Sequence, residues 1–117
     1  MPIMFEPPAT AAKIVIVGAG AMGSIYAGFF AEAGHSVAVV DIWAEHISAI
    51  ARAGLRLEGA SGDRVVQGIG AFGTVEEAGP GDLFVIATKA NGVAQAAASI
   101  AKVCLLYTSD AADEDLR

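Results

Sequence analysis

Three glycines, Gly18, Gly20 and Gly23, carry the most specific chemistry in the chain, within the segment IVIVGAGAMG. A β-branched run precedes them and a helix-forming segment follows, which is the context that a G-x-G-x-x-G phosphate-binding loop requires. We expect Gly18 to make the tight turn, Gly20 to let a pyrophosphate approach the backbone, and Gly23 to let the helix pack close to the sheet. The alternative is a packing turn that binds nothing.

The residues between these glycines belong to the same predicted loop. Ala21 and Met22 open the helix, where free backbone N–H groups and the helix dipole favour anionic phosphates. Ala19 lies between the first two glycines. We therefore predict that the whole loop, Gly18 through Gly23, binds the phosphates of a dinucleotide.

Two charged residues follow other predicted strands, at the edge of the sheet where ligands bind in such folds. Asp41 ends the strand SVAVVD and is placed to accept hydrogen bonds from the adenosine ribose hydroxyls. It would repel a 2′-phosphate and so favours NAD(H); the alternative is that it caps the next helix. Lys89 follows LFVIAT and could contact a cofactor phosphate or the substrate; the alternative is a solvated surface lysine.

Elements that would position these residues alternate along the chain. Continuous apolar runs predict buried strands, and Gly34 and Gly54 stand where helices should end. The segment LRLEGASGDRVV predicts a short hairpin or a pair of small strands. Alternating strands and helices predict an α/β, Rossmann-type parallel sheet with flanking helices. The predicted strands are 14–17, 36–41 and 83–89, and the predicted helices are 21–33, 44–53 and 92–103, after a flexible leader at 1–12.

Composition excludes several classes of protein. A net charge of −6 argues against a nucleic-acid partner, and no apolar run reaches the length of a membrane span. The N-terminus lacks the positive charge and long apolar core of a signal peptide, so we expect a cytoplasmic protein. Cys104 is the only cysteine, and neither His35 nor His46 has a metal partner at useful spacing, so no metal site is expected. We expect His35 in a turn and His46 on the surface or half-buried.

The segments KIVIVGAGAMGSIYA, AGHSVAVVD, AIARAGLRLEG and DLFVIATKA resemble the N-terminal domain of the ketopantoate reductase family, from Lys13 to about Val103. The resemblance implies NADPH-dependent reduction of a 2-oxo acid on the route to pantothenate and coenzyme A. It matches Lys89 to a family lysine near the cofactor. It also implies a following helical substrate domain that holds the general acid, and a homodimer of the full-length protein.

One position departs from the family. The family commonly places an arginine for the 2′-phosphate where this chain has Ile42. The resemblance implies NADP(H), whereas Asp41 and Ile42 argue for NAD(H). Opine or hydroxyacid dehydrogenases fit the glycines and Asp41 equally well, and a non-enzymatic nucleotide-sensing domain is a further alternative. The hairpin GLRLEGASGDR and the segment DLFVIATKA favour ketopantoate reductase.

The C-terminal segment CLLYTSDAADEDLR continues none of these patterns. It holds four of the thirteen acidic residues, and residues 104–114 resemble the translation of a transposase adapter used in sequencing libraries. We therefore expect residues 13–103 to form an incomplete dinucleotide-binding domain and 104–117 to be an artefact. On this interpretation Cys104 is not a nucleophile and Tyr107 is not a catalytic acid.

Overall fold

The computed structural model describes residues 11–59 and 62–115, and side chains as far as residue 106. Most of the expected leader, Ala60 and Ser61 of the predicted hairpin turn, and the Tyr107 side chain lie outside the described residues.

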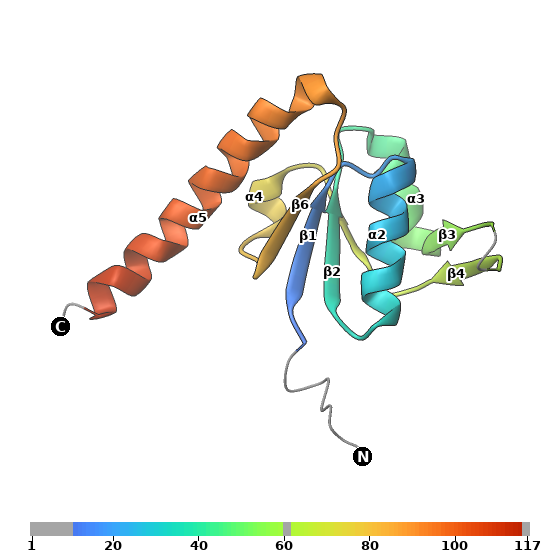
Figure 1. The fold of residues 1–117 in the computed structure, drawn as a ribbon, viewed down its shortest axis with the longest axis horizontal. Coiled ribbons are helices and arrows are strands. Elements are labelled where there is room, and N and C mark those ends of the chain that lie inside the picture. The colour runs from blue at the N-terminus through green and yellow to red at the C-terminus, as the bar shows by residue number, and fades with distance from the viewer. Residues whose placement is uncertain (1–10, 60–61, 116–117) are drawn as a thin grey trace, which may run out of the picture.

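A parallel sheet of four strands forms the centre of the fold (Figure 1). Each strand runs parallel to its neighbours, in the order β5-β2-β1-β6. β1 and β2 are joined through a helix, as a parallel pair requires. The prediction of a Rossmann-type α/β sheet is confirmed. The strands are β1 (Lys13–Val17), β2 (Ser36–Val40), β5 (Gly70–Phe72) and β6 (Leu83–Ile86).

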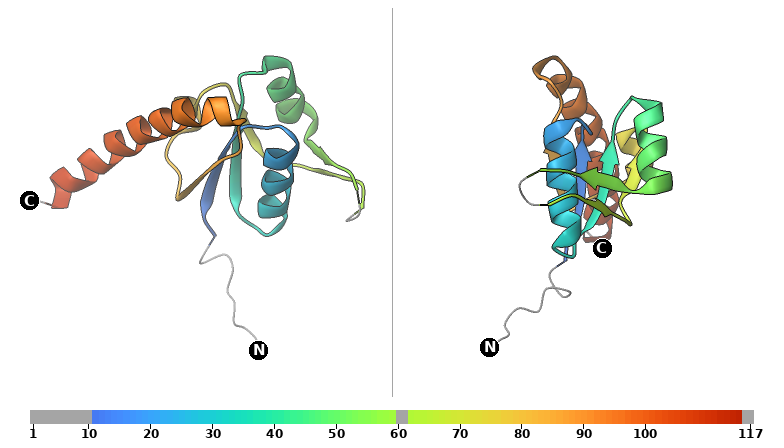
Figure 2. Two further views of the ribbon diagram at one scale, coloured as in Figure 1. Left: turned by 45° about the horizontal axis from the view of Figure 1, so that its top comes forward. Right: turned by 90° about the vertical axis from the view of Figure 1, so that its right-hand side faces the viewer.

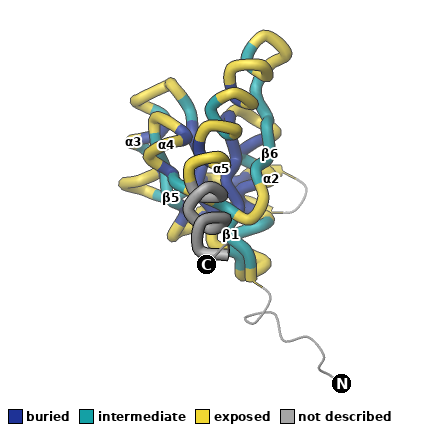
Figure 3. Tube along the Cα trace, turned by 90° about the vertical axis from the view of Figure 1, so that its left-hand side faces the viewer, coloured by how far each residue is buried: buried dark blue, intermediate teal, exposed yellow. Residues whose placement is uncertain are grey.

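Helices cover both faces of this sheet (Figure 2). Helices α2 (Ala21–Glu32) and α3 (Ala44–Ala53) lie on one face. The short helix α4 (Val75–Ala78) and the long helix α5 (Val93–Asp115) lie on the other, and a 3-10 turn, η1 (Ala90–Gly92), leads into α5. The result is a three-layer arrangement with the sheet at its centre, in which β1 and β2 are mostly buried and β5 and β6 are mostly of intermediate burial (Figure 3).

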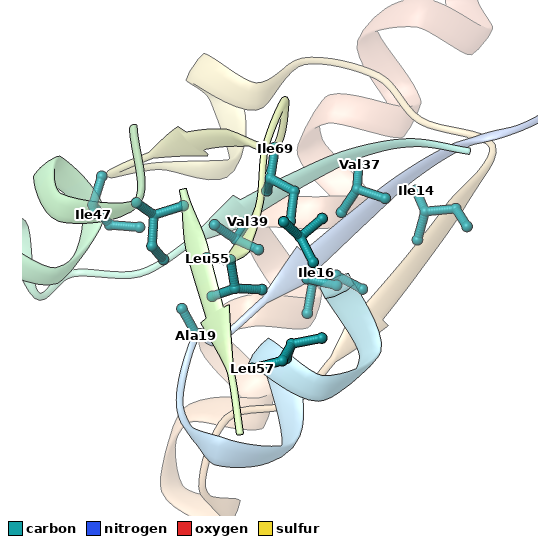
Figure 4. Packing of buried hydrophobic residues seen from close by; sticks show 12 residues of the cluster. Ile14, Ile16, Ala19, Val37, Val39, Ile47, Leu55, Leu57 and Ile69 are labelled. Carbon is teal, nitrogen blue, oxygen red and sulfur yellow. The ribbon is translucent and has the colours of Figure 1, made fainter. Parts of the chain in front are cut away.

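The core is divided between the two faces because successive side chains of a strand point to opposite sides. Ile14 and Ile16 of β1 pack with α3 and the hairpin on one face (Figure 4). Val15 and Val17 pack on the other face with α4 and with Val103 of α5. Burial on both faces explains the continuous β-branched runs of β1 and β2.

A small antiparallel hairpin extends the α2 and α3 layer. It consists of β3 (Leu55–Leu57) and β4 (Arg64–Val66), which confirms the predicted hairpin. Leu57 packs over Gly28 of α2, where a Cβ would lie only 2.5 Å from the leucine side chain. Arg64 pairs with Glu32 at the end of α2, with one nitrogen–oxygen distance of 2.9 Å.

The part of the chain after β4 differs from the prediction in four respects. β6 ends at Ile86 rather than Lys89. One further bond, from the Ala87 N–H to the Val17 oxygen, follows the strand, and Ala87 and Thr88 then pass close to Gly18 of the glycine loop. β6 is also only partly buried, since it is the edge strand. The structure adds β5, which no pattern predicted, and continues α5 as far as Asp115.

Candidate functional site

A cleft of about 670 Å³ lies at the carboxyl ends of β1, β2 and β6. This is the edge at which ligands bind in open parallel sheets. Four predicted site residues, Gly18, Gly20, Asp41 and Lys89, line it. The remaining lining residues are Val17, Val40, Ile42, Gly73, Thr74, Val75, Glu76, Ala87, Thr88, Asn91, Gly92, Gln95, Ala96 and Ser99.

Gly18 and Gly23 are required by packing within the protein. Gly18 has a φ of +109°, and a Cβ there would lie 2.8 Å from the carbonyl group of Ala87. A Cβ at Gly23 would lie 1.8 Å from the carbonyl oxygen of Gly18, so helix α2 contacts the loop that precedes it. The positive φ of Gly18 fits the tight turn expected there, and Gly23 lets α2 pack closely, in this structure against the glycine loop.

Gly20 differs from the other two glycines. It adopts an extended conformation as the N-cap of α2, with a φ of −75°, and a Cβ there would meet no atom within 4 Å. Since glycine has no side chain, it supplies no cap to the N–H groups of the first turn, and this turn holds no acidic residue. Packing therefore does not require a glycine here. The residue leaves the helix N-terminus open to a ligand.

The other loop residues divide between interior and surface. Ala19 is 2% exposed and belongs to the core, whereas Met22 is 55% exposed. Ala21 is also exposed. Neither Ala21 nor Met22 lines the cleft, so a ligand role for them would rest on the backbone N–H groups of the first turn of α2.

Asp41 connects the glycine loop to helix α3. One carboxylate oxygen accepts the N–H of Ala19 at 2.8 Å, and the other accepts the N–H of Trp43, the N-cap residue of α3, at 3.0 Å. The capping alternative is thus partly right, because Asp41 supports the start of α3 from two residues before the cap. Its bond to the glycine loop was not anticipated, since sequence spacing does not reveal which amide a carboxylate reaches.

Lys89 lines the cleft after β6, which lies on the other side of β1 from β2. It is exposed, directly precedes η1, and follows Thr88. The Thr88 hydroxyl oxygen is buried and has no hydrogen-bond partner within the described part of the chain. Sequence reasoning singled out Lys89 but missed Thr88, although the two are adjacent in ATK.

Charge is unevenly distributed around the cleft. Asp41 and Glu76 are its acidic lining residues, and Lys89 is its basic one. Glu76 is 3.8 Å from the ammonium group of Lys102 on α5, an exposed pair that is worth little. Beside Asp41, Ile42 is 95% exposed and carries no charge. The β2 side of the cleft therefore has no cation among its lining residues.

The histidines have backbone partners. His35 lies in the expected turn between α2 and β2, where its Nδ1 accepts the N–H of Ala12 at 3.0 Å. His46 is half-buried, and its Nε2 is 2.8 Å from the carbonyl oxygen of Ala19 in the glycine loop. Sequence analysis allowed half-burial for His46 but anticipated no contact with the loop.

Comparison with known families agrees with this geometry. Residues 14–106 match the family model described as ketopantoate reductase PanE/ApbA. The chain belongs to this family. Its members are NAD(P)H-dependent reductases, so a nicotinamide dinucleotide is the cofactor class for which the cleft must be tested. Among curated proteins, no relative matches the chain.

Two structural observations fit such a cofactor. The open N-terminus of α2 at Gly20 suits a pyrophosphate, because that glycine is not required by any protein contact. Thr88 lines the cleft, and its buried hydroxyl could donate a hydrogen bond to an acceptor on a bound cofactor. Most of the cleft-lining residues are apolar or glycine, which is usual for cofactor sites.

Other site classes find no support in the described residues. Within 11–59 and 62–115, no group of three or more histidine, cysteine or acidic residues could hold a metal ion. The helices of that same region include none that is both long enough and apolar enough to cross a membrane.

Proposed function

We propose that the chain forms the cofactor-binding part of a reductase that converts 2-dehydropantoate (ketopantoate), a 2-oxo acid, into its 2-hydroxy acid, pantoate. The observation that carries the proposal is the uncapped start of α2 at Gly20, which opens onto the cleft in a member of the ketopantoate reductase family. The family assignment favours this reaction over opine or hydroxyacid dehydrogenase activity and over nucleotide sensing.

The pyrophosphate of the dinucleotide is proposed to lie at the N–H groups of Gly20, Ala21 and Met22. The adenosine ribose lies beside Asp41, whose carboxylate accepts its hydroxyls, and Lys89 faces a phosphate or the substrate from the β6 side of the cleft. When the dinucleotide is bound, its nicotinamide supplies the hydride. The residues described here bind and orient the dinucleotide. By family resemblance the proton donor is a lysine beyond residue 103, so we expect the 117-residue chain to bind dinucleotide without turnover.

We further propose that the site prefers NADH to NADPH. A 2′-phosphate next to the ribose would lie beside the Asp41 carboxylate, with uncharged Ile42 as its neighbour. Two like charges 4 Å apart repel by about 1 kcal/mol in water and about 4 kcal/mol near a protein surface. Asp41 is half-buried, so the repulsion lies between these two limits, and we expect about tenfold weaker binding of NADPH.

Titration of the purified chain with both dinucleotides tests cofactor binding. Trp43 is the only tryptophan and adjoins Ile42 at the cleft, so energy transfer from its emission to the bound nicotinamide reports binding. Saturable binding of NADH, about tenfold tighter than NADPH, is the expected result. Tighter binding of NADPH would refute the cofactor preference alone, and failure of both to bind would refute the proposed function.

The reaction requires a second experiment. The gene is amplified from the source DNA through the codon for Val103, and its product is assayed with NADH, NADPH and 2-dehydropantoate. We expect the frame to continue into a helical domain and the product to oxidise NADH when 2-dehydropantoate is present. A frame that encodes CLLYTSDAADEDLR and then stops would refute the interpretation of residues 104–117 as an artefact.

A further inference from the structure

The peptide group between Ala19 and Gly20 is held by hydrogen bonds from two directions. Its carbonyl oxygen lies 2.8 Å from Nε2 of His46 and 3.0 Å from the hydroxyl of Ser24. The preceding N–H, that of Ala19, is bound by Asp41. Since a carbonyl oxygen can only accept, Nε2 of His46 must carry a proton and donate it. Ala19 is therefore fixed from β2 and from α3 at once.

His46 is itself held in position. It lies in the first turn of α3, and its imidazole stacks on the Trp43 indole with a centroid distance of 5.0 Å and an interplanar angle of 29°. The N–H of Trp43 is bound by Asp41. The imidazole thus has a fixed partner on one face and a fixed acceptor at Nε2.

A planar trans peptide transmits this constraint to the ligand side of the loop. In such a peptide the C=O of Ala19 and the N–H of Gly20 point in opposite directions. A carbonyl directed at His46 therefore directs the Gly20 N–H away from α3. Gly20 lines the cleft, so the orientation of its N–H decides whether a phosphate there finds a donor.

We infer that His46 is a positioning residue for dinucleotide binding, which acts through the Ala19 carbonyl to orient the Gly20 N–H toward the pyrophosphate. The inference rests on the proposed function, because it assigns a cofactor phosphate to that N–H. His46 does not itself line the cleft. Its imidazole is held against the rear of the loop by Trp43, and Ser24 supports the same oxygen.

Three substitutions at this position separate hydrogen bonding from packing. In His46→Gln the amide nitrogen stands as many bonds from the backbone as Nε2, so it can still donate to Ala19. In His46→Asn the amide nitrogen corresponds to Nδ1 and falls short, and His46→Ala removes the donor. His35→Ala is the matched control, because His35 also bonds a backbone group, that of Ala12, but lies at the other end of α2.

Amide hydrogen exchange of the unliganded protein is the first measurement. We expect faster exchange in residues 18–22 of His46→Ala and His46→Asn, and wild-type exchange in His46→Gln and in the His35→Ala control. Unchanged loop exchange in His46→Ala would overturn the inference. This comparison needs no ligand, so it decides separately whether His46 orders the loop. If the wild-type protein binds no dinucleotide, the proposed function fails together with the assigned ligand, and only the ordering of the loop by His46 stands.

NADH affinity is the second measurement. We expect about five- to tenfold weaker binding by His46→Ala and His46→Asn, recovery to within about threefold of wild type in His46→Gln, and no change in His35→Ala. An equal loss of NADH affinity in the Gln and Ala variants would show that the site depends on packing of the imidazole ring on Trp43 rather than on hydrogen-bond donation. That result, or wild-type affinity in His46→Ala, would overturn the inference.

Discussion

Replacing Gly20 with alanine should leave the fold intact and weaken cofactor binding. The backbone at Gly20 has a φ of −75°, which alanine adopts without strain, and the new Cβ would meet no protein atom within 4 Å. Fewer accessible unfolded conformations should stabilise the variant by about 0.4–1 kcal/mol. Alanine is a poorer N-cap than glycine by several tenths of a kcal/mol. We therefore expect the melting temperature to change by less than about 4 °C.

The cost of this substitution should appear in binding, because the methyl group enters the space proposed for the pyrophosphate. A charge-assisted hydrogen bond contributes about 1.5–3 kcal/mol, so displacing the phosphate from one N–H should weaken NADH binding about 10- to 100-fold. Calorimetric titration with NADH measures this loss directly.

Gly34→Ala provides a control with the opposite expected pattern. Gly34 has a φ of +100° at the turn after α2, a Cβ there would meet no atom within 4 Å, and the residue takes no part in the cleft. Backbone strain should destabilise this variant by about 1–2 kcal/mol while NADH affinity is retained. If Gly20→Ala binds NADH as wild type does, the glycine loop does not contact the pyrophosphate, and the argument from the open helix N-terminus fails.

Three further substitutions test separate parts of the structure. Gly23→Ala should lower the free energy of unfolding by about 3 kcal/mol or more in denaturant titration, because its Cβ would lie 1.8 Å from the Gly18 oxygen. Ile42→Arg should tighten NADPH binding about tenfold and leave NADH binding unchanged, since the side chain is 95% exposed and gains a charge-assisted bond to the 2′-phosphate; equal gains for both cofactors would contradict it. The Arg64 side chain hydrogen-bonds to Glu32 and lowers the pKa of that carboxyl, so its stabilising effect is present above the ordinary carboxyl pKa and is lost as pH falls through the lowered value. Glu32→Gln should therefore flatten the dependence of the melting temperature on pH between about 5 and 3, and an unchanged slope would show that the pair contributes nothing.

Local pattern predicted the elements whose burial is nearly complete. β1 and β2 are buried on both faces, so their sequences are continuous apolar runs that end where the strands end. Helix α3 begins and ends at the predicted residues. It ends at Ala53 because Gly54, with a φ of +90°, follows as its C-cap. β5 escaped detection because the segment Gly70–Phe72 is short and glycine-led, and only its pairing with β2 makes it a strand.

The site was predicted in its parts but not in its connections. Spacing and residue type were enough to select Gly18, Gly20, Asp41 and Lys89, and all four line one cleft because parallel strands bring their carboxyl ends together. Spacing could not show that Asp41 and His46 bind the N–H and C=O of the same residue, Ala19. Such contacts depend on how α3 packs beside the loop, which is a tertiary property.

The two interpretations of Asp41, ribose ligand and structural cap, are compatible in this geometry. A carboxylate has about four acceptor positions, and the backbone N–H groups of Ala19 and Trp43 occupy one on each oxygen. One position per oxygen is left, which is what a pair of ribose hydroxyls requires. The two backbone bonds also hold the carboxylate in one orientation before a ligand arrives, so binding would not incur the entropy cost of ordering it. The bonds that make Asp41 a structural residue would therefore also prepare it for the ribose contact proposed above.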